Sequence, residues 1–491
     1  MTKLIGREAE RKILDRFYQS SKAEFLAIYG RRRVGKTFLI QDFYTKKKDA
    51  VCFHSTGLKD GNLRDQIKSF TQVIGKTFYN GAELQEKSTW MDVFEQLTEA
   101  INKLPKNKKV ILFFDEFPWM ASKRSKLIQA LDHYWNRYWS INPKIKLIVC
   151  GSAASWILEK LIHNKGGLYN RITYQIELNP FSLSESKTFL WEKGIKLSEE
   201  HVLKIYMVMG GIPLYLDQVE KGLSADQIID SLCFTKRGLL FNEFDKLFQS
   251  LFEHFDIHKE LILLISENIY GISQVELMNK SSKSVGGRLK KRLQELEDTG
   301  FIESFIPHQH KEKGIYYRIV DEYILFYLKW IAPVTNSIKR YDKEAGYWLS
   351  KSKSPSWKSW AGLAYEAICF KHISPIRKAL HIPPGVEIGS WRYVPRKEKF
   401  QDQGAQIDLL FDREDGAITI CEIKYNEQPF TIDKEYAQKL LNKANVYKQQ
   451  TGTRKDIFIA MITKNGLKPS MYSEEIIHAV VTIKDLFNDN D

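Results

Sequence analysis

The stretch EFLAIYGRRRVGKTFLI, residues 24–40, decides the fold of the N-terminal half of the chain. Its apolar run Phe25–Tyr29 predicts a buried strand, and residues 30–37 match the phosphate-binding loop pattern G-x-x-x-x-G-K-[ST]. The glycines let the backbone curl so that its N–H groups point at phosphate oxygens, and the start of the following helix adds its positive dipole end. The stretch therefore predicts a nucleotide site between a strand and a helix.

The residues of this loop have expected parts in binding ATP and Mg²⁺. Lys36 should reach the β- and γ-phosphates and also act in catalysis, while the Thr37 hydroxyl should bind Mg²⁺. The expected cofactor-binding residues here are Gly30, Arg31, Arg32, Arg33, Val34, Gly35, Lys36, Thr37 and Phe38.

The segment KKVILFFDEF, residues 108–117, is an apolar run that ends in two acids. A strand buried on both faces of a parallel sheet has this composition, and ligands of open α/β sheets gather at the carboxyl ends of the strands. We expect Asp115 to hold the Mg²⁺ shell and Glu116 to be the catalytic base that polarises the attacking water. The structural alternative for such a pair of acids is a solvated strand end.

Two further strands carry candidate nucleotide contacts. IKLIVCGSAASW, residues 145–156, predicts a buried strand followed by Ser152, which either senses the γ-phosphate or caps the next helix. GLYNRITYQIELNPFS, residues 167–182, supplies a fourth strand, and Arg171 precedes it. This arginine either serves as a finger across the interface of a homo-oligomer or lies on the surface.

Six short motifs follow one another in a fixed order along the first half of the chain. They are Gly6-Arg7-Glu8, the loop at 30–37, FFDEF at 113–117, CGSAAS at 150–155, NPFS at 179–182 and GGIP at 210–213. Together they resemble the archaeal-type ATPase family, a branch of the AAA+ and STAND NTPases. The resemblance implies a parallel sheet with an added strand between the loop strand and the acid-bearing strand, followed by a helical lid. It also places Pro213 in a nucleotide-sensing lid segment, and Gly6 and Arg7 over the adenine side.

The middle of the chain predicts a winged helix-turn-helix. Leu289, Leu293 and Leu296, with Val285, form an apolar stripe at helical spacing, and basic residues occupy the other positions of that helix. Two earlier helical segments precede it, and a hairpin around HQHKEK, 308–313, follows it. Such a module places its third helix in a DNA groove or serves only for packing.

These patterns divide the chain into five parts. We expect an ATPase core at 1–182, a helical lid at 183–255, a winged helix at 256–334, a linker at 335–356 and a C-terminal α/β domain at 357–491. Lysine, serine and proline are frequent in residues 335–356, which is why we expect a linker there.

The C-terminal part contains QIDLLFDREDGAITICEIKY, residues 406–425, which predicts two strands joined by an Asp-Gly turn. Side chains alternate along a strand, so Glu422 and Lys424 share one face, and antiparallel pairing brings Asp408 beside Glu422. Two close carboxylates raise one another's pKa unless a cation holds them, and Mg²⁺ prefers such oxygen ligands. A metal-bound water positioned by Lys424 could attack a phosphodiester.

This D…ExK arrangement resembles the PD-(D/E)xK nuclease superfamily, which has the α/β restriction-endonuclease fold. Glu366, on an apolar helical segment, matches the acid on the first helix of that fold, and Asp408, Glu422 and Lys424 match its catalytic core. Two positions depart from the pattern: Ile407 precedes the aspartate where proline is usual, and Lys443 stands four residues before Tyr447 where some relatives have glutamine. A degenerate fold with Glu422 and Lys424 as an ion pair is the alternative.

Composition limits the classes of partner. The 491 residues carry a net charge of +14 and a pI near 9.2, which favours nucleic acid or an anionic surface as partner, with solvated lysines on helix faces as the alternative. We expect nucleic acid, DNA more than RNA, although the charge itself does not distinguish the two. No apolar run approaches the length of a membrane span. The cysteines lack CxxC spacing, which favours a reducing cytoplasm: Cys52, Cys150, Cys233, Cys369 and Cys421.

The sequence therefore predicts a Mg²⁺-dependent ATPase joined through a winged helix to a nuclease-like domain, with nucleotide state controlling access to the nuclease site. The alternative is a regulatory or scaffold ATPase that binds nucleic acid or protein and cleaves nothing. A processive motor ranks last, because the chain has no second ATPase core and no recognisable helicase motifs.

Overall fold

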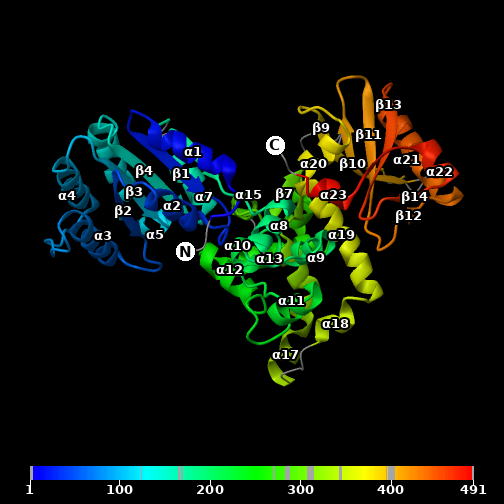
Figure 1. The fold of residues 1–491 in the computed structure, drawn as a ribbon, viewed down its shortest axis with the longest axis horizontal. Helices are drawn as coiled ribbons and strands as arrows, with labels where there is room; N and C mark the ends of the chain where they lie inside the picture. Colours follow the sequence, from blue (N-terminus) through cyan, green and yellow to red (C-terminus); the bar gives the residue numbers. More distant parts are fainter. Residues whose placement is uncertain are drawn as a thin grey trace. The chain divides into compact units, whose positions relative to one another are not determined.

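The computed structural model of the chain describes residues 4–122, 124–163, 166, 168, 170–268, 271–281, 288–306, 314–341, 346–393, 395 and 404–488 (Figure 1). The chain divides into two compact units, of which the first holds Met1–Pro180 and Gln294–Gly300 and the second holds Phe181–Leu293 and Phe301–Asp491. Within the described part of the chain, no helix is both long and apolar enough to cross a membrane.

The first unit is built on a five-stranded sheet in which every neighbouring pair is parallel. Its order is β2-β3-β4-β1-β5, so β4 lies between β1, which precedes the phosphate loop, and β3, which ends in Asp115. The added strand expected between those two is thereby confirmed, whereas β2 was not predicted. The strands are β1 (Glu24–Tyr29), β2 (Ala50–Thr56), β3 (Lys109–Asp115), β4 (Ile145–Gly151) and β5 (Tyr174–Glu177).

Helices cover both faces of this sheet (Figure 1). The face with Phe114 packs against α3, α4 and α6 in one continuous aromatic-rich core, and the face with Phe113 meets Tyr44 of α2, with ring centroids 6.3 Å apart. The helices are α1 (Glu8–Gln19), α2 (Lys36–Thr45), α3 (Leu63–Phe78), α4 (Trp90–Asn102), α5 (Phe117–Met120), α6 (Leu127–Tyr134), π-helical η1 (Trp135–Trp139), α7 (Ala154–Ile157) and η2 (Leu158–Ile162).

The second unit begins with helices where a lid was expected. They are α8 (Leu183–Glu192), α9 (Glu199–Met209), α10 (Pro213–Leu216), α11 (Ala225–Cys233), α12 (Glu243–Leu251) and α13 (Phe255–Ser266). An antiparallel sheet of order β6-β8-β7 follows, formed by β6 (Ile272–Ser273), β7 (Ile302–Phe305) and β8 (Tyr316–Ile319), with α14 (Gln274–Lys280) and α15 (Leu289–Asp298) between its strands. Val285 and the turn with His308 and His310 lie outside the described residues.

The segment 335–356 differs from the linker that the sequence predicts. It follows α16 (Glu322–Phe326), π-helical η4 (Tyr327–Ile331) and 3₁₀-helical η5 (Ala332–Val334), and it forms α17 (Thr335–Tyr341) and α18 (Tyr347–Lys351). Trp348 is fully buried, and its backbone N–H donates to Asp230 of α11 at 2.6 Å. A tryptophan that buries this much apolar area anchors the segment, although lysine and serine dominate its composition.

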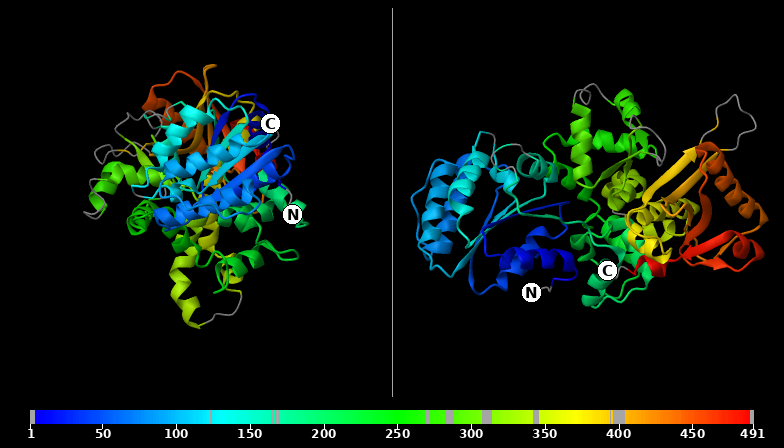
Figure 2. Two further views of the ribbon diagram at one scale, coloured as in Figure 1. Left: turned by 90° about the vertical axis from the view of Figure 1, so that its left-hand side faces the viewer. Right: turned by 90° about the horizontal axis from the view of Figure 1, so that it is seen from above.

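The C-terminal part of the second unit is a mixed sheet of order β15-β13-β11-β10-β9. β10 is antiparallel to β9 and β11, and β11, β13 and β15 are parallel. α19 and α21 lie on opposite sides of this sheet (Figures 1 and 2). The elements are α19 (Pro355–Lys371), α20 (Ile373–Ala379), β9 (Glu387–Tyr393), β10 (Ala405–Asp412), β11 (Ala417–Lys424), β12 (Phe430–Thr431), α21 (Lys434–Thr451), β13 (Asp456–Thr463), β14 (Leu467–Lys468), α22 (Met471–Ile476), β15 (Ile477–Val481) and α23 (Ile483–Leu486).

Candidate functional site

The loop between β1 and α2 has the backbone that its glycines permit. Gly30 has φ +134° and a Cβ there would collide with the carbonyl of Leu178, while Gly35 has φ +93° and forms the N-cap of α2. Arg33 also lies in the left-handed region, with φ 73°, at a strain of order 1–3 kcal/mol for a residue with a side chain. The loop thus leads directly from a buried strand into a helix N-terminus, the geometry that favours bound anions.

Lys36 occupies the interior of this loop. Its Nζ donates to the carbonyls of Gly30 and Arg31, both at 2.8 Å. Burial lowers the pKa of Lys36, and the charges of Glu116 and Asp115 oppose that shift. Of the other loop residues expected to contact nucleotide, Arg31 and Val34 are buried, Arg32 and Arg33 are half-buried, and Phe38 is exposed.

Thr37 and Asp115 meet across the carboxyl end of the sheet. The Thr37 hydroxyl donates to Asp115 Oδ2 at 2.9 Å, and His54 Nε2 lies 3.7 Å from the same oxygen. Burial raises the pKa of Asp115, but hydrogen bonds from His54, Thr37 and Cys150 outweigh it and hold the pKa below its usual value. A hydroxyl beside an ionised carboxylate is a donor set that suits Mg²⁺.

Glu116 follows in a left-handed conformation, with φ 45°, which turns its side chain toward β4. Its Oε2 accepts hydrogen bonds from the Ser152 backbone N–H at 3.1 Å and from the Ser152 hydroxyl at 2.9 Å. The alternative that Ser152 caps the next helix is wrong, because the N-cap of α7 is Ala153. Ser152 instead holds the carboxylate that we expect to polarise water.

Arg7 links two of the ordered motifs to the loop. Its guanidinium donates to the carbonyl of Asn179 at 2.7 Å and to that of Val34 at 3.4 Å. Gly6, with φ 66°, precedes it, and Arg7 itself is buried. The buried arginine therefore braces the loop against the segment that follows β5.

The C-terminal hairpin brings two carboxylates together as its sequence predicts. β10 and β11 pair from Asp412 opposite Ile418 to Leu409 opposite Cys421. Asp408 and Glu422 are the next residues of the two strands, and the charge of Glu422 acts on Asp408. Asp408 Oδ2 accepts the backbone N–H of Ile423 at 3.0 Å. Burial and the charge of Glu422 raise the pKa of Asp408.

Glu422 is held by three side chains. Oε1 accepts the Tyr436 hydroxyl at 2.7 Å and lies 2.8 Å from Lys424 Nζ, and Oε2 lies 2.5 Å from Lys443 Nζ. Burial raises the pKa of Glu422, but the two lysines more than offset it, so the pKa is lowered. Burial acts to lower the pKa of Lys424, yet its pairing with Glu422 raises it.

Glu366 on α19 belongs to the same electrostatic cluster. Burial first, and then the charge of Asp408, raise the pKa of Glu366 to about 8, against the opposing charge of Lys424. No three acidic, histidine or cysteine side chains of the described residues stand in an arrangement that could hold a metal ion. The charges of Asp408, Glu422 and Lys424 act on Glu366, so the four predicted residues are close enough to interact, and Lys424 and Lys443 pair with Glu422.

A family model matches the N-terminal part of the chain. Residues 4–219 match the model of a family described as an ATPase domain found predominantly in Archaea. An uncharacterized ATP-binding protein of Methanocaldococcus jannaschii is 46% identical over 44 residues, which are 9% of this chain and 75% of that protein. The chain belongs to this ATPase-domain family through residues 4–219.

Other similarities span more of the chain. An uncharacterized protein of the same archaeon is 25% identical over 449 residues, covering 90% of this chain and 92% of its own. The Walker-type ATPase of Pyrococcus abyssi has 18% identity and a TM-score of 0.46, with 66% of this chain and 96% of that structure covered. The Aeropyrum pernix ORC2 protein has 16% identity and a TM-score of 0.43, covering 69% and 95%.

Two predicted residues of the ATPase domain lie away from the loop contacts described above. Arg171 is exposed, in the turn that precedes β5. Pro213 opens α10 at its first position, after Gly210 with φ +59°, and falls in the second unit. The family match includes both residues.

Three residues of the two sites were not predicted. His54, at the end of the unpredicted β2, contacts Asp115, and Tyr436 and Lys443 of α21 contact Glu422. The position of Lys443 four residues before Tyr447 was noted as a departure from a motif, and that spacing is the signal that could have found it. Nothing in the sequence near His54 marks a site.

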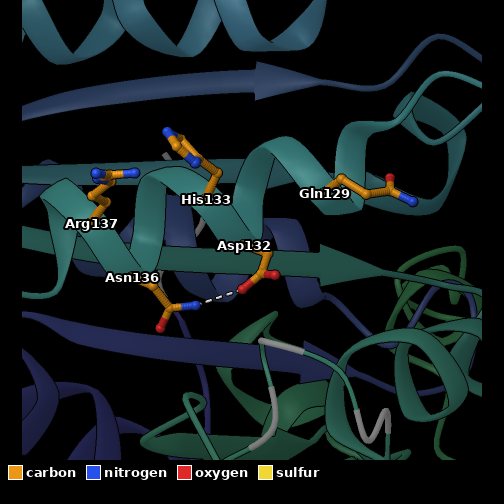
Figure 3. Close-up of a pocket in the computed structure, with 5 residues that line it drawn as sticks. All are labelled: Gln129, Asp132, His133, Asn136 and Arg137. Atoms are coloured by element: carbon orange, nitrogen blue, oxygen red, sulfur yellow. Dashed lines mark hydrogen bonds between the residues drawn. The ribbon is translucent and has the colours of Figure 1, made fainter.

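A shallow hollow on α6 and η1 is not the nucleotide site. It is lined by Gln129, Asp132, His133, Asn136 and Arg137, none of which was predicted. Figure 3 shows Asp132 and Asn136 pointing to one side of the helix, joined by a 2.5 Å hydrogen bond, and His133 and Arg137 pointing to the other. Side chains that diverge in this way do not converge on one ligand.

The raised pKa of Glu366 predicts a pH-dependent stability. A carboxyl whose pKa rises from 4.5 to about 8 on folding binds its proton more tightly in the folded state, so its contribution is present below about pH 4.5 and is lost as pH rises toward 8. In metal-free buffer, Glu366→Gln should raise the thermal midpoint relative to the parent protein near pH 9 and have little effect near pH 5. The rise from 4.5 to about 8 is about 3.5 pKa units, and one unit corresponds to about 1.4 kcal/mol, so the full differential is on the order of 5 kcal/mol.

The measurement is a pair of melting curves at each pH. Glu414→Gln serves as the matched control, because Glu414 is an exposed residue of the same domain in the hairpin turn. A difference between the Glu366 variant and the parent that is the same at both pH values would contradict a raised pKa.

Proposed function

We propose that this protein hydrolyses ATP in its N-terminal domain and acts on the phosphodiester backbone of nucleic acid through its C-terminal domain. Membership of the ATPase-domain family supports the first part. So does the loop geometry, in which Lys36 lies where the phosphates would bind and the Thr37–Asp115 pair provides oxygen ligands for Mg²⁺. Glu116, held by Ser152, is the proposed base.

The remaining nucleotide contacts are proposals of the same kind. Arg171 is exposed and so free to reach a neighbouring copy as a finger, and Pro213 would belong to a nucleotide-sensing segment of the lid. Gly6 and Arg7 would lie on the adenine side, since Arg7 already braces the loop from beside it.

One observation carries the nucleic-acid part of the proposal. Asp408, Glu422 and Lys424 meet at one end of a hairpin with Glu366 within electrostatic range, in a mixed five-stranded sheet flanked by helices. Burial and the charge of a neighbouring carboxylate raise the pKa of Glu366 and of Asp408. Buried carboxyl groups perturbed in this way are costly for folding alone, and their clustering supports a functional site. The basic net charge of +14 agrees with a polyanionic substrate.

The carboxylate oxygens of this cluster are chemically suitable ligands for a divalent cation, but their present arrangement does not leave them open to one. Mg²⁺ can be held by one or two carboxylates together with waters, and Asp408 and Glu422 supply two. Glu422, however, has both oxygens engaged by Tyr436 and the lysines. When bound, the cation would supply an activated water, while Lys424 would orient the scissile phosphate.

The helix that carries Glu366 offers a route for control by nucleotide. Lys371, at the end of α19, lies 2.6 Å from the buried Glu322 carboxylate, whose other oxygen is 2.6 Å from the position that a Cβ on Gly210 would take. The next residue, His372, accepts the backbone N–H of Leu183 at the start of α8 through Nε2 at 3.0 Å. A movement of the lid next to Pro213 would therefore act on α19 and on the acid cluster.

This route predicts that Lys371→Met uncouples the two activities. Loss of the Lys371–Glu322 pair should leave ATP hydrolysis within about twofold of the parent, and it should reduce the effect of ATP on nucleic-acid cleavage at least several-fold. Glu322 is buried while Lys371 is exposed, so the substitution leaves a buried carboxylate without this partner, and folding is checked by circular dichroism. Lys358→Met, an exposed position of the same helix, is the control, and equal ATP effects in all three proteins would argue against the route.

The direct test of the proposed function uses the purified full chain. Plasmid and single-stranded oligonucleotides are incubated with it, with and without ATP and with Mg²⁺ or Mn²⁺. We expect cleavage that requires the divalent ion and responds to ATP. Intact substrates under every condition, with ATP hydrolysis present, would reject the nucleic-acid part and leave the ATPase part standing.

A second candidate is a regulatory or scaffold ATPase that cleaves nothing. The engagement of Glu422 by two lysines favours it, because ion pairs of this kind also stabilise degenerate sites. In this case the three-stranded sheet with α13, α14 and α15 would be a winged helix used for binding DNA or protein. A cellular effect that survives both Asp408→Ala and Lys424→Ala would select this candidate.

A further inference from the structure

His54 lies near the end of β2 with both of its ring nitrogens beside polar groups. Its Nε2 lies 3.7 Å from Asp115 Oδ2 and 3.3 Å from the Thr56 hydroxyl, and its Nδ1 lies 3.3 Å from the Tyr44 hydroxyl of α2. About a quarter of the His54 side chain is exposed. The imidazole is therefore placed between the Asp115 carboxylate and the helix that continues from the phosphate loop.

The pairing of β2 with β3 determines this place. His54 is the register partner of Phe113, and Asp115 follows two residues later on the same face of β3. The imidazole stacks on the Phe113 ring, with centroids 4.6 Å apart and an angle of 22° between the two planes. Because the stacking holds the plane of the imidazole, one nitrogen stays directed at Asp115 and the other at Tyr44.

The chemistry of these partners assigns the proton of the neutral ring. A carboxylate accepts hydrogen bonds and donates none, so the nitrogen that faces Asp115 carries the N–H. The other nitrogen, Nδ1, is then an acceptor, and the Tyr44 hydroxyl is the donor that faces it. Tyr44 thus stabilises the tautomer of His54 that can donate to Asp115.

Asp115 receives donors from three parts of the chain. Its Oδ1 accepts the backbone N–H of Glu116 at 3.0 Å, and its Oδ2 accepts the Thr37 hydroxyl at 2.9 Å. His54 approaches Oδ2 from β2, which belongs neither to the phosphate loop nor to β3. Contacts on both oxygens, with two of them on Oδ2 from different elements, restrict rotation of the carboxylate about its Cβ–Cγ bond.

We propose that His54 is a positioning residue of the nucleotide site, whose Nε2–H keeps the Asp115 carboxylate turned toward the Mg²⁺ of a bound nucleotide. Tyr44 keeps the ring in the tautomer that this requires. The inference rests on the proposed ATP hydrolysis and adds two residues to its site. The contact of 3.7 Å is longer than a hydrogen bond, and contacts of this kind shorten when the substrate binds.

Two amide substitutions separate the roles of the ring nitrogens. The amide nitrogen of glutamine can reach the position of Nε2, whereas that of asparagine reaches only the position of Nδ1. Loss of a group that orients a metal ligand costs about 10–100-fold, so His54→Asn should lower kcat about tenfold or more. His54→Gln should stay within about threefold of the parent, because it restores the donor. Tyr44→Phe, which removes the hydroxyl that faces Nδ1, should fall between them.

The matched control is a histidine of the same unit outside this site. His133→Asn, at a half-buried position of α6, should hydrolyse ATP like the parent. Hydrolysis by Tyr44→Phe at the rate of the parent would overturn the part assigned to Tyr44.

A second readout does not depend on turnover. The affinity of the full chain for a fluorescent ATP analogue is measured by titration, once in Mg²⁺ and once in EDTA. His54→Asn should weaken binding about tenfold in Mg²⁺ and leave it unchanged in EDTA, because the histidine acts on the nucleotide only through Asp115. An equal loss in both media would mean that the substitution disturbs the phosphate loop itself, and would overturn the proposal.

A third variant separates the nitrogens from the stacking. His54→Phe can still stack on Phe113 but lacks both nitrogens, so it should show the loss expected of His54→Asn and carries the test if the asparagine variant does not fold. A His54→Gln protein as impaired as His54→Asn, or hydrolysis by His54→Phe at the rate of the parent, overturns the positioning role. A parent protein that binds the ATP analogue in neither medium would instead refute the proposed ATPase function, so the two failures are distinguishable.

Discussion

Lys36→Ala will abolish ATP hydrolysis. The ammonium of Lys36 is preorganised inside the phosphate loop by the carbonyls of Gly30 and Arg31, so it needs little rearrangement to meet the charge that develops on the transferring phosphoryl group. Removing one preorganised donor of this kind costs about 10²–10³ in kcat. Phosphate release under saturating ATP measures it. Nucleotide affinity should fall too, because the lysine also meets the ground-state phosphates.

Two comparisons make this result specific. Lys46→Ala, at an exposed residue that follows the same helix and pairs with Asp42, should leave hydrolysis unchanged. Glu116→Gln should retain nucleotide binding and lose turnover, because the proposed base meets only the attacking water. Hydrolysis that persists in Lys36→Ala would refute the assignment of this loop. Lost hydrolysis with unaltered nucleic-acid cleavage would instead refute control of the C-terminal domain by nucleotide.

The sequence predicts those strands of the ATPase sheet that are buried on both faces. β1, β3 and β4 are continuous apolar runs, each followed by a glycine or an acid, and they lie where those runs predict. β2 was missed because it is an edge strand whose sequence, AVCFHST, places His54 and Ser55 among its apolar residues. His54 was missed together with β2, because its contact with Asp115 depends on the pairing of β2 with β3.

The C-terminal hairpin was predictable for a different reason. An Asp-Gly turn fixes the register that pairs Leu409 with Cys421, and this register makes Asp408 and Glu422 the next residues of the two strands. Side chains do not alternate strictly between the two faces along β10. The pairing of β10 with β9 shifts between Ile407 and Leu410, and both of these residues lie in the core cluster that also contains residues of α21. The spacing of Lys443 before Tyr447 marked its position, but its contact with Glu422 depends on how α21 packs over the sheet, which the sequence does not show. Trp348, in the segment expected to be a linker, is a second case, because its contact with Asp230 also depends on tertiary packing.

Asp408→Asn will abolish any nucleic-acid cleavage while leaving the fold intact. The asparagine oxygen can still accept the N–H of Ile423, which Asp408 now accepts at 3.0 Å, so no buried donor loses its partner. Burial and the neighbouring charge of Glu422 already raise the pKa of this carboxyl, and a neutral amide relieves that repulsion. The thermal midpoint should therefore stay equal or rise.

Cleavage should fall at least about 100-fold, because stabilisation of transition-state charge by a held cation amounts to several kcal/mol and each 1.4 kcal/mol is a factor of ten. Binding of the nucleic acid should change little, since Lys424 and Lys443 remain in place. Asp412→Asn is the matched control on the same strand, where the carboxylate pairs with Lys455 at 2.5 Å, away from Glu422. Cleavage that survives Asp408→Asn but not Asp412→Asn would move the chemistry to the other end of the hairpin. Loss of substrate binding in Asp408→Asn alone would mean that the cluster recognises nucleic acid and does not cut it.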